Sequence, residues 1–142
     1  MGAKITSVRA KEILAQRGLL SLQVIVETDD GARGISTPES GVSTGKHEAA
    51  FLLDGGERYN GLGLQRAAEA VNSVIGPALK GIDITAQGEI DRLMIKLDGT
   101  PDKSRLGANS IVGVSLAALK AAAVSCGLPL YRYIGGANAC TL

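Results

Sequence analysis

The hydroxyl-rich loop, Ser40-Gly41-Val42-Ser43-Thr44-Gly45-Lys46-His47-Glu48, carries the residue types best suited to binding a charged ligand. Gly41 and Gly45 leave the backbone free at two points four residues apart. Between them, the hydroxyl and carbonyl oxygens of Ser43 and Thr44 are ligands for a hard cation or partners for a phosphate. We therefore expect a mobile lid that closes over a ligand. A solvated Gly/Ser-rich linker is the simpler alternative.

A phosphate-binding P-loop is the other motif that this segment suggests, because Thr44-Gly45-Lys46 matches the end of a Walker A sequence. Two positions argue against it. Ser40 stands where the first glycine of the motif belongs, and His47 stands where a Ser or Thr should bind magnesium. The segment is therefore not a nucleotide-binding P-loop.

Length and composition limit the class of protein. The chain has 142 residues, a net charge of +1 and 3% aromatic residues, which fits one domain and disfavours a nucleic-acid surface.

Cys126 and Cys140 form no secreted disulfide framework, so reduced thiols and a cytoplasmic location are expected. The single histidine, His47, lies far from both cysteines in sequence, so a metal site built on them lacks ligands. No apolar run reaches the ~20 residues of a membrane helix.

Hydrophobic periodicity predicts three strands at the start of the chain. Residues 5–14 alternate, with Thr6, Val8 and Ala10 on one face. Residues 20–28 alternate more clearly, with leucine and valine at the even positions, and residues 32–37 form a third strand after an Asp29-Asp30-Gly31 turn. Short turns between sequential strands predict an antiparallel meander.

About four helices are expected to follow. An apolar stripe starts at Leu64 and should end at Gly76-Pro77, because proline disrupts a helix interior. Residues 87–97 predict a second helix, and residues 108–126 a long third one that is apolar or small almost all round. Residues 128–136 form a last short helix or turn. Strands first and helices second indicate an α+β domain with helices on one face of the sheet.

Several of these motifs together resemble the N-terminal domain of enolase (phosphopyruvate hydratase) over essentially the full chain. The hydroxyl-rich loop is similar to the first active-site loop of that family, and Arg58-Tyr59-Asn60-Gly61 to the turn after it. Residues 97–100 and 106–117 follow the longest signature of the family in this domain. Residues 129–136 are similar too, although related barrel enzymes share that ending.

The resemblance implies a three-stranded meander followed by four helices, serving over residues 1–142 as a cap on a β/α barrel that this chain does not contain. The barrel of enolases carries the catalytic acids and bases, so no catalytic residue is expected here. The intact enzyme interconverts 2-phosphoglycerate and phosphoenolpyruvate in glycolysis with two magnesium ions. By resemblance, Ser40, Gly41, Val42, Ser43, Thr44, Gly45 and His47 form the substrate lid, and Ser43 binds the second magnesium.

Three hypotheses follow for the chain. The first is the cap of a magnesium-dependent carbon–oxygen lyase, with its own C-terminal barrel domain as partner and a homo-oligomer as the intact form. The second is a stand-alone enolase-like module for oligomerisation or partner binding, without activity. The third, the cap of a muconate-type cycloisomerase, fits residues 129–136 but not the signature at residues 106–117. No nucleic-acid or membrane partner is expected.

Overall fold

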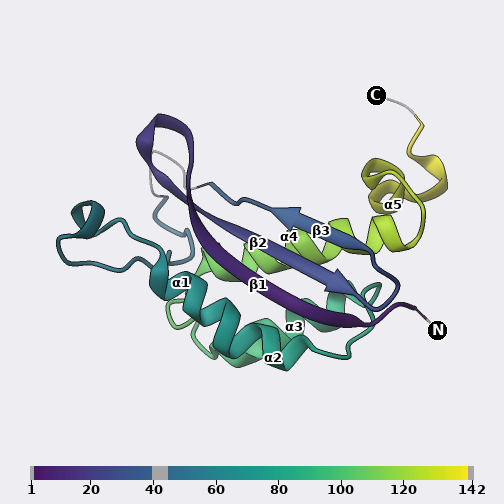
Figure 1. The fold of residues 1–142 in the computed structure, drawn as a ribbon, viewed down its shortest axis with the longest axis horizontal. Coiled ribbons are helices and arrows are strands. Elements are labelled where there is room, and N and C mark those ends of the chain that lie inside the picture. The colour runs from purple at the N-terminus through teal and green to yellow at the C-terminus, as the bar shows by residue number, and fades with distance from the viewer. Residues whose placement is uncertain (1, 40–44, 141–142) are drawn as a thin grey trace.

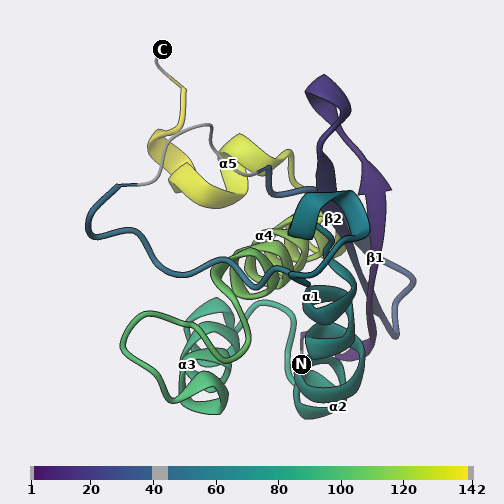
Figure 2. The ribbon, with the colours of Figure 1, turned by 90° about the vertical axis from the view of Figure 1, so that its left-hand side faces the viewer.

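The computed structural model describes residues 2–39 and 45–140, which fold into a sheet layer and a helix layer (Figure 1). The sheet is an antiparallel meander in the order β1-β2-β3, formed by β1 (Ile5–Leu14), β2 (Leu20–Thr28) and β3 (Arg33–Ser36). Figure 2 shows the sheet edge-on with the helices on one side of it. The predicted α+β class, with three antiparallel strands followed by four helices, is confirmed.

The first two strands have the predicted bounds, but the first does not alternate as expected. A bulge between Ile5 and Ser7 breaks the pairing with β2, and Ile5 and Val8 are the buried residues while Thr6 is exposed. The prediction that Thr6 shares the face of Val8 is therefore wrong, because one extra residue at a bulge shifts the alternation. In β2 the predicted apolar face is buried: Leu20, Leu22, Val24 and Val26.

The first helix is longer than predicted. It runs through α1 (Gln65–Glu69), a π-helical segment (Ala70–Ile75) and α2 (Gly76–Leu79). The prediction that Gly76-Pro77 ends it is wrong: the Gly76 N–H donates to the carbonyl of Val71, five residues earlier, and Pro77 falls in the first turn of α2, where its missing N–H costs little. Gly76 is there for packing, since a Cβ would lie 2.8 Å from the Val8 carbonyl of β1.

The remaining helices are α3 (Gln87–Asp98), α4 (Ala108–Ser125) and α5 (Leu130–Gly135), close to their predicted positions. Short 3₁₀ turns lie at Gln16–Gly18, Arg58–Gly61 and Gly136–Asn138. The third strand is two residues shorter than predicted, since it covers Arg33–Ser36 rather than residues 32–37. Cys126 and Cys140 are free, exposed thiols.

Helix α4 lies against β2 and β3 and forms the centre of the core. Its buried face is mostly alanine, which lets the sheet approach closely: a Cβ on Gly34 of β3 would lie 2.0 Å from the Ala117 carbonyl. Among the described residues, α4 is the one helix whose length and composition would allow it to cross a membrane. It is 61% buried inside the fold, as a core helix is.

The turn between β2 and β3 contains an aspartate with a strongly lowered pKa. Asp30 accepts hydrogen bonds from the hydroxyls of Ser125 and Thr28 and from the Ala32 N–H, and these lower its pKa from 3.8 to about 2. Because the folded pKa lies below the unfolded one, the stabilisation is complete above pH 4 and is lost as the pH falls towards 2.

We therefore expect Asp30→Asn to lower the free energy of unfolding at pH 7. The difference from wild type should shrink between pH 4 and pH 2, because the carboxylate of the unfolded wild-type chain takes up a proton there before that of the folded protein. Urea unfolding at a series of pH values measures this difference. A gap that stays constant down to pH 2 would contradict the assigned hydrogen bonds.

Candidate functional site

The predicted lid falls largely outside the described residues. Ser40, Gly41, Val42, Ser43 and Thr44 all lie there, so the predicted magnesium role of Ser43 stays a prediction. The last part of the hydroxyl-rich loop is described as an exposed turn in which the Gly45 N–H donates to the Glu48 carboxylate (2.9 Å) and the Glu48 N–H donates back to the Gly45 carbonyl (3.1 Å). His47 is exposed, and its ring makes no hydrogen bond to the residues that the structure describes.

The chain leaving the loop, residues 50–52, is its trailing stem and is fastened to the start of α4. The Ala50 N–H donates to the carbonyl of Asp102 (2.7 Å), and the Ala50 carbonyl accepts from the Ala108 N–H (2.8 Å). Two residues further along the stem, the Leu52 N–H donates to Oδ1 of Asn109 (3.0 Å), and Nδ2 of Asn109 donates to the Leu52 carbonyl (3.2 Å). Figure 2 shows this part of the chain crossing in front of the N-terminal end of α4.

The chain approaching the loop, residues 36–38, is its leading stem and lies against the same helix one turn later. Ser36 is buried and its hydroxyl donates to the Gly113 carbonyl. The ring of Pro38 lies over Gly113, where an added Cβ would approach it to 3.3 Å. The Pro38 carbonyl accepts a hydrogen bond from the buried hydroxyl of Ser21 at 3.0 Å. Both stems therefore rest on α4.

The sequence analysis did not identify Asn109 or Ser36. Both are buried polar residues, 2% exposed each. Buried polar side chains are almost always hydrogen-bonded. An amide in the first turn of a nearly all-apolar helix is therefore the signal that could have marked Asn109 as holding another segment.

The turn that leads into α4 is organised by a buried carboxylate. Asp98, 1% exposed, accepts from the hydroxyl and N–H of Thr100 and from the Leu106 N–H (2.8 Å). Burial raises the pKa of Asp98, but these hydrogen bonds outweigh it and hold the pKa below its ordinary value. Lys103, in the left-handed region at φ 63°, donates to the Thr100 carbonyl. Residues 103–104 lead into α4.

The turn after the loop is tied to β1 and to α1. Arg58 forms an ion pair with Glu12, and the N–H of Leu64 also donates to that carboxylate (2.6 Å). The hydrogen bond from Arg58 lowers the pKa of Glu12, against burial, which raises it. Asp54 accepts from the N–H groups of Gln65 and Arg66, so a carboxylate lies at the N-terminus of α1. These contacts position the chain between the loop and the first helix.

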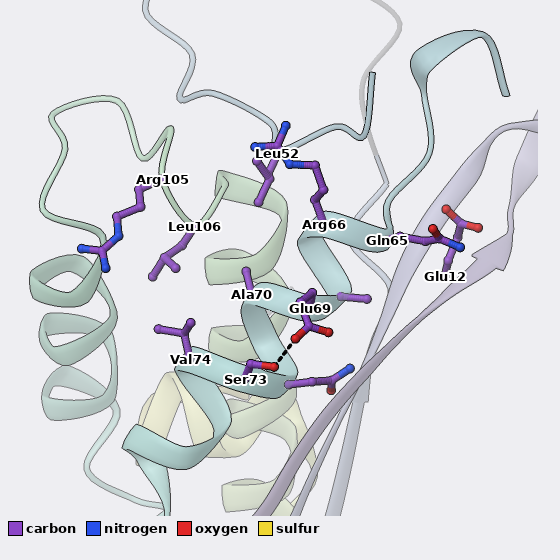
Figure 3. Close-up of a pocket in the computed structure, with 12 residues that line it drawn as sticks. Glu12, Leu52, Gln65, Arg66, Glu69, Ala70, Ser73, Val74, Arg105 and Leu106 are labelled. Carbon is purple, nitrogen blue, oxygen red and sulfur yellow. Dashed lines mark hydrogen bonds between the residues drawn. The ribbon is translucent and has the colours of Figure 1, made fainter. Parts of the chain in front are cut away.

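An open groove of about 840 Å³ runs along α1 and the π-helical segment (Figure 3). Its lining combines the apolar side chains of Leu52, Leu106, Ala70 and Val74 with charged side chains of both signs. Among the lining residues, the Ser73 hydroxyl donates to the Glu69 carboxylate. The groove therefore borders the trailing stem, because Leu52 belongs to both.

The described residues do not form a metal site of their own. Within residues 2–39 and 45–140, no three His, Cys, Asp or Glu side chains converge where they could hold a metal ion. Magnesium prefers an octahedral set of oxygen ligands, usually with one or two carboxylates. The part of the chain that the structure describes does not fit a complete magnesium site.

The fold and the loop define an α+β domain that presents a hydroxyl-rich loop held at both stems by its longest helix. Residues 5–134 match the family described as enolase, N-terminal domain, and the chain belongs to that family. An enolase from Methanopyrus kandleri is 53% identical over 136 residues, which is 96% of this chain. The aligned part is 32% of that enolase, so the chain spans about a third of the length of this curated relative.

Proposed function

We propose that this chain is the N-terminal cap and lid of an enolase-like lyase that interconverts 2-phosphoglycerate and phosphoenolpyruvate in glycolysis. The observation that carries the proposal is the match to the enolase N-terminal domain over residues 5–134, in a chain that spans only 32% of a 53%-identical enolase. In this proposal the catalytic acids and bases belong to a C-terminal barrel, and this chain contributes the loop that covers the substrate.

Within that proposal, Ser40, Gly41, Val42, Ser43, Thr44, Gly45 and His47 form the lid, and Ser43 is the residue of this chain that would hold the second of two magnesium ions. When bound, magnesium supplies positive charge that stabilises the negative charge developing on the substrate. The part played by this chain is to bring one hydroxyl and one carbonyl oxygen to the ion. The proposed location of the protein is the cytoplasm.

We also propose the chain's own C-terminal barrel domain as partner, within a homo-oligomer. Large apolar side chains stay exposed on the outer side of α4 and on α5, including Val112 (46%), Leu116 (41%), Tyr131 (61%) and Ile134 (62%). Covering them would remove apolar surface from water and stabilise the assembly. This surface supports a docking role for α4 and α5.

The same exposed side chains are the observation that favours the second candidate, an enolase-like module that binds a partner without activity. The length of the reading frame separates the two. We expect the gene to continue past Leu142 for about 250–300 residues, the scale of a β/α barrel. A frame that closes at Leu142 would favour the module.

The experiment that tests the proposed reaction is an assay of the full-length gene product with 2-phosphoglycerate and magnesium. We expect formation of phosphoenolpyruvate that stops when a chelator removes the metal. A folded, full-length protein that leaves 2-phosphoglycerate unchanged at saturating magnesium would refute the proposal.

Magnesium binding by the 142-residue chain alone gives an independent prediction. We expect a weak interaction or none, because one serine cannot supply the octahedral oxygen set that magnesium needs. Isothermal titration calorimetry measures it, with calcium as a second cation to reveal non-specific binding. A tight, saturable magnesium site in the isolated chain would show that the ligand set is complete within it.

A further inference from the structure

We infer that Asn109 is a positioning residue, which fixes the trailing stem of the hydroxyl-rich loop on α4. The leading stem contacts α4 at Gly113, one helical turn further along. Asn109 touches neither substrate nor metal in this account and acts through the backbone of Leu52. The functional part of the inference rests on the proposed role of the loop as a lid. The structural part, that Asn109 anchors the Leu52 backbone to α4, does not depend on that role.

The contact between Asn109 and Leu52 is a complete pairing of two amides. The Leu52 N–H donates to Oδ1 of Asn109 (3.0 Å), and Nδ2 of Asn109 donates to the Leu52 carbonyl (3.2 Å), 57 residues apart in sequence. Asn109 is 2% exposed and Leu52 is 9% exposed. A buried backbone amide that loses its partner pays its desolvation cost, so breaking this pairing while Leu52 stays buried is unfavourable.

The backbone beside this contact has no room for a side chain at residue 107. Gly107 has φ +85°, and a Cβ there would lie 2.4 Å from the Cβ of Leu52 and 2.9 Å from its nitrogen. The trailing stem therefore lies directly against the residue that precedes α4. The backbone hydrogen bonds of Ala50 to Asp102 and Ala108 hold the stem two residues earlier in the chain.

The leading stem meets α4 four residues later. A Cβ on Gly113 would lie 2.8 Å from Cγ2 of Val24 and 3.3 Å from the ring of Pro38, so the absence of a side chain admits both. The Ser36 hydroxyl bonds the Gly113 carbonyl across 77 residues of sequence. Residues four apart lie on one face of a helix, about 6 Å apart along its axis. One rigid helix thus sets the separation of the two stems.

This arrangement predicts which contacts of the loop are lost when the Asn109 side chain is removed. Without the amide, the trailing stem loses the two bonds between Leu52 and Asn109 but keeps the bond from the Ala108 N–H to the Ala50 carbonyl, while the leading stem keeps its own bonds. One end of the loop is therefore loosened and the rest of the fold is left in place. Ser110 provides a matched control, because it is the next residue of α4, is fully buried, and donates its hydroxyl to the Ala67 carbonyl of α1 (3.1 Å), away from the loop.

The test compares Asn109→Ala with Ser110→Ala in the full-length gene product by amide hydrogen exchange. The reporter is the Ala50 N–H, whose acceptor, the Asp102 carbonyl, neither substitution changes. We expect exchange at Ala50 to accelerate about tenfold in Asn109→Ala, equivalent to about 1.4 kcal/mol of local opening. Exchange at Ala50 should stay at the wild-type rate in Ser110→Ala. An equal acceleration in both variants, or none in Asn109→Ala, overturns the inference.

A second variant covers the case in which Asn109→Ala does not fold. Asn109→Asp keeps an acceptor for the Leu52 N–H but replaces the donor with a carboxylate oxygen that repels the Leu52 carbonyl, so exchange at Ala50 should accelerate relative to wild type. Asn109→Asp that exchanges like wild type at Ala50 would contradict the role of the paired amide.

The functional arm uses the 2-phosphoglycerate assay on the same proteins. We expect Asn109→Ala to lower kcat/KM about tenfold and to raise the magnesium concentration that gives half the maximal rate, with Ser110→Ala unchanged in both. Unchanged magnesium dependence in a folded Asn109→Ala enzyme overturns the positioning role. Hydrogen exchange is measured without turnover, so the two proposals can fail separately. An inactive wild type would refute the proposed function, and the exchange rates alone would still decide whether Asn109 anchors the stem.

Discussion

Gly34→Ala is expected to lower the free energy of unfolding by about 3 kcal/mol or more, the upper end for overpacking a core. A Cβ at this position would lie 2.0 Å from the Ala117 carbonyl and 2.4 Å from the Ala121 nitrogen. Both obstacles are backbone atoms in the middle of α4, so no rotamer change relieves the contact. The strand β3 would have to move off the helix, and with it the residues that lead to the hydroxyl-rich loop.

Urea unfolding of Gly34→Ala beside Gly88→Ala measures this effect. Gly88 lies in the first turn of α3, where the nearest obstacle to a Cβ is the flexible guanidinium of Arg92 at 3.2 Å. Alanine is favoured over glycine within a helix by about 0.5–1 kcal/mol, so Gly88→Ala should be neutral or stabilising. A Gly34→Ala variant as stable as wild type would mean that β3 does not lie on α4 as described.

Ser43→Ala is expected to lower the activity of the full-length enzyme about 100-fold, the usual scale for removing one group that stabilises charge in a transition state. The substitution removes the hydroxyl proposed to bind the second magnesium and leaves the carbonyl in place. A lost ligand should also weaken the metal site, so the magnesium concentration for half-maximal rate should rise.

The control for Ser43→Ala is Ser73→Ala, which removes an exposed hydroxyl that bonds Glu69 on the first helix, away from the loop. Rates at several magnesium concentrations measure both variants, and only Ser43→Ala should depart from wild type. Full activity and unchanged magnesium dependence in Ser43→Ala would remove the metal role assigned to this residue.

Local sequence patterns predicted most of the elements. Leucine and valine at the even positions, with Ile25 the one exception to the alternation, predicted the strand at residues 20–28, and the apolar interior of residues 108–126 predicted the long helix α4. The errors arose where tertiary contacts override local preference. Gly76-Pro77 would end most helices, yet the chain stays helical past it through a π-type hydrogen bond to Val71, and Gly76 packs closely against β1.

The site was predicted only in part for the same reason. The composition of the hydroxyl-rich loop predicted that it binds a ligand, but composition gives no information on which residues hold the two stems of the loop in place. Its anchors, Asn109 and Ser36, form hydrogen bonds across 57 and 77 residues of sequence. Contacts of that separation follow from the fold rather than from any local pattern.

The most direct test of the central claim compares the 142-residue chain with the full-length gene product in one assay of 2-phosphoglycerate dehydration at saturating magnesium. If this chain supplies the lid and the remainder of the enzyme supplies the catalytic groups, the full-length protein forms phosphoenolpyruvate and the folded 142-residue chain forms none. Magnesium-dependent turnover by the 142-residue chain alone would contradict the account.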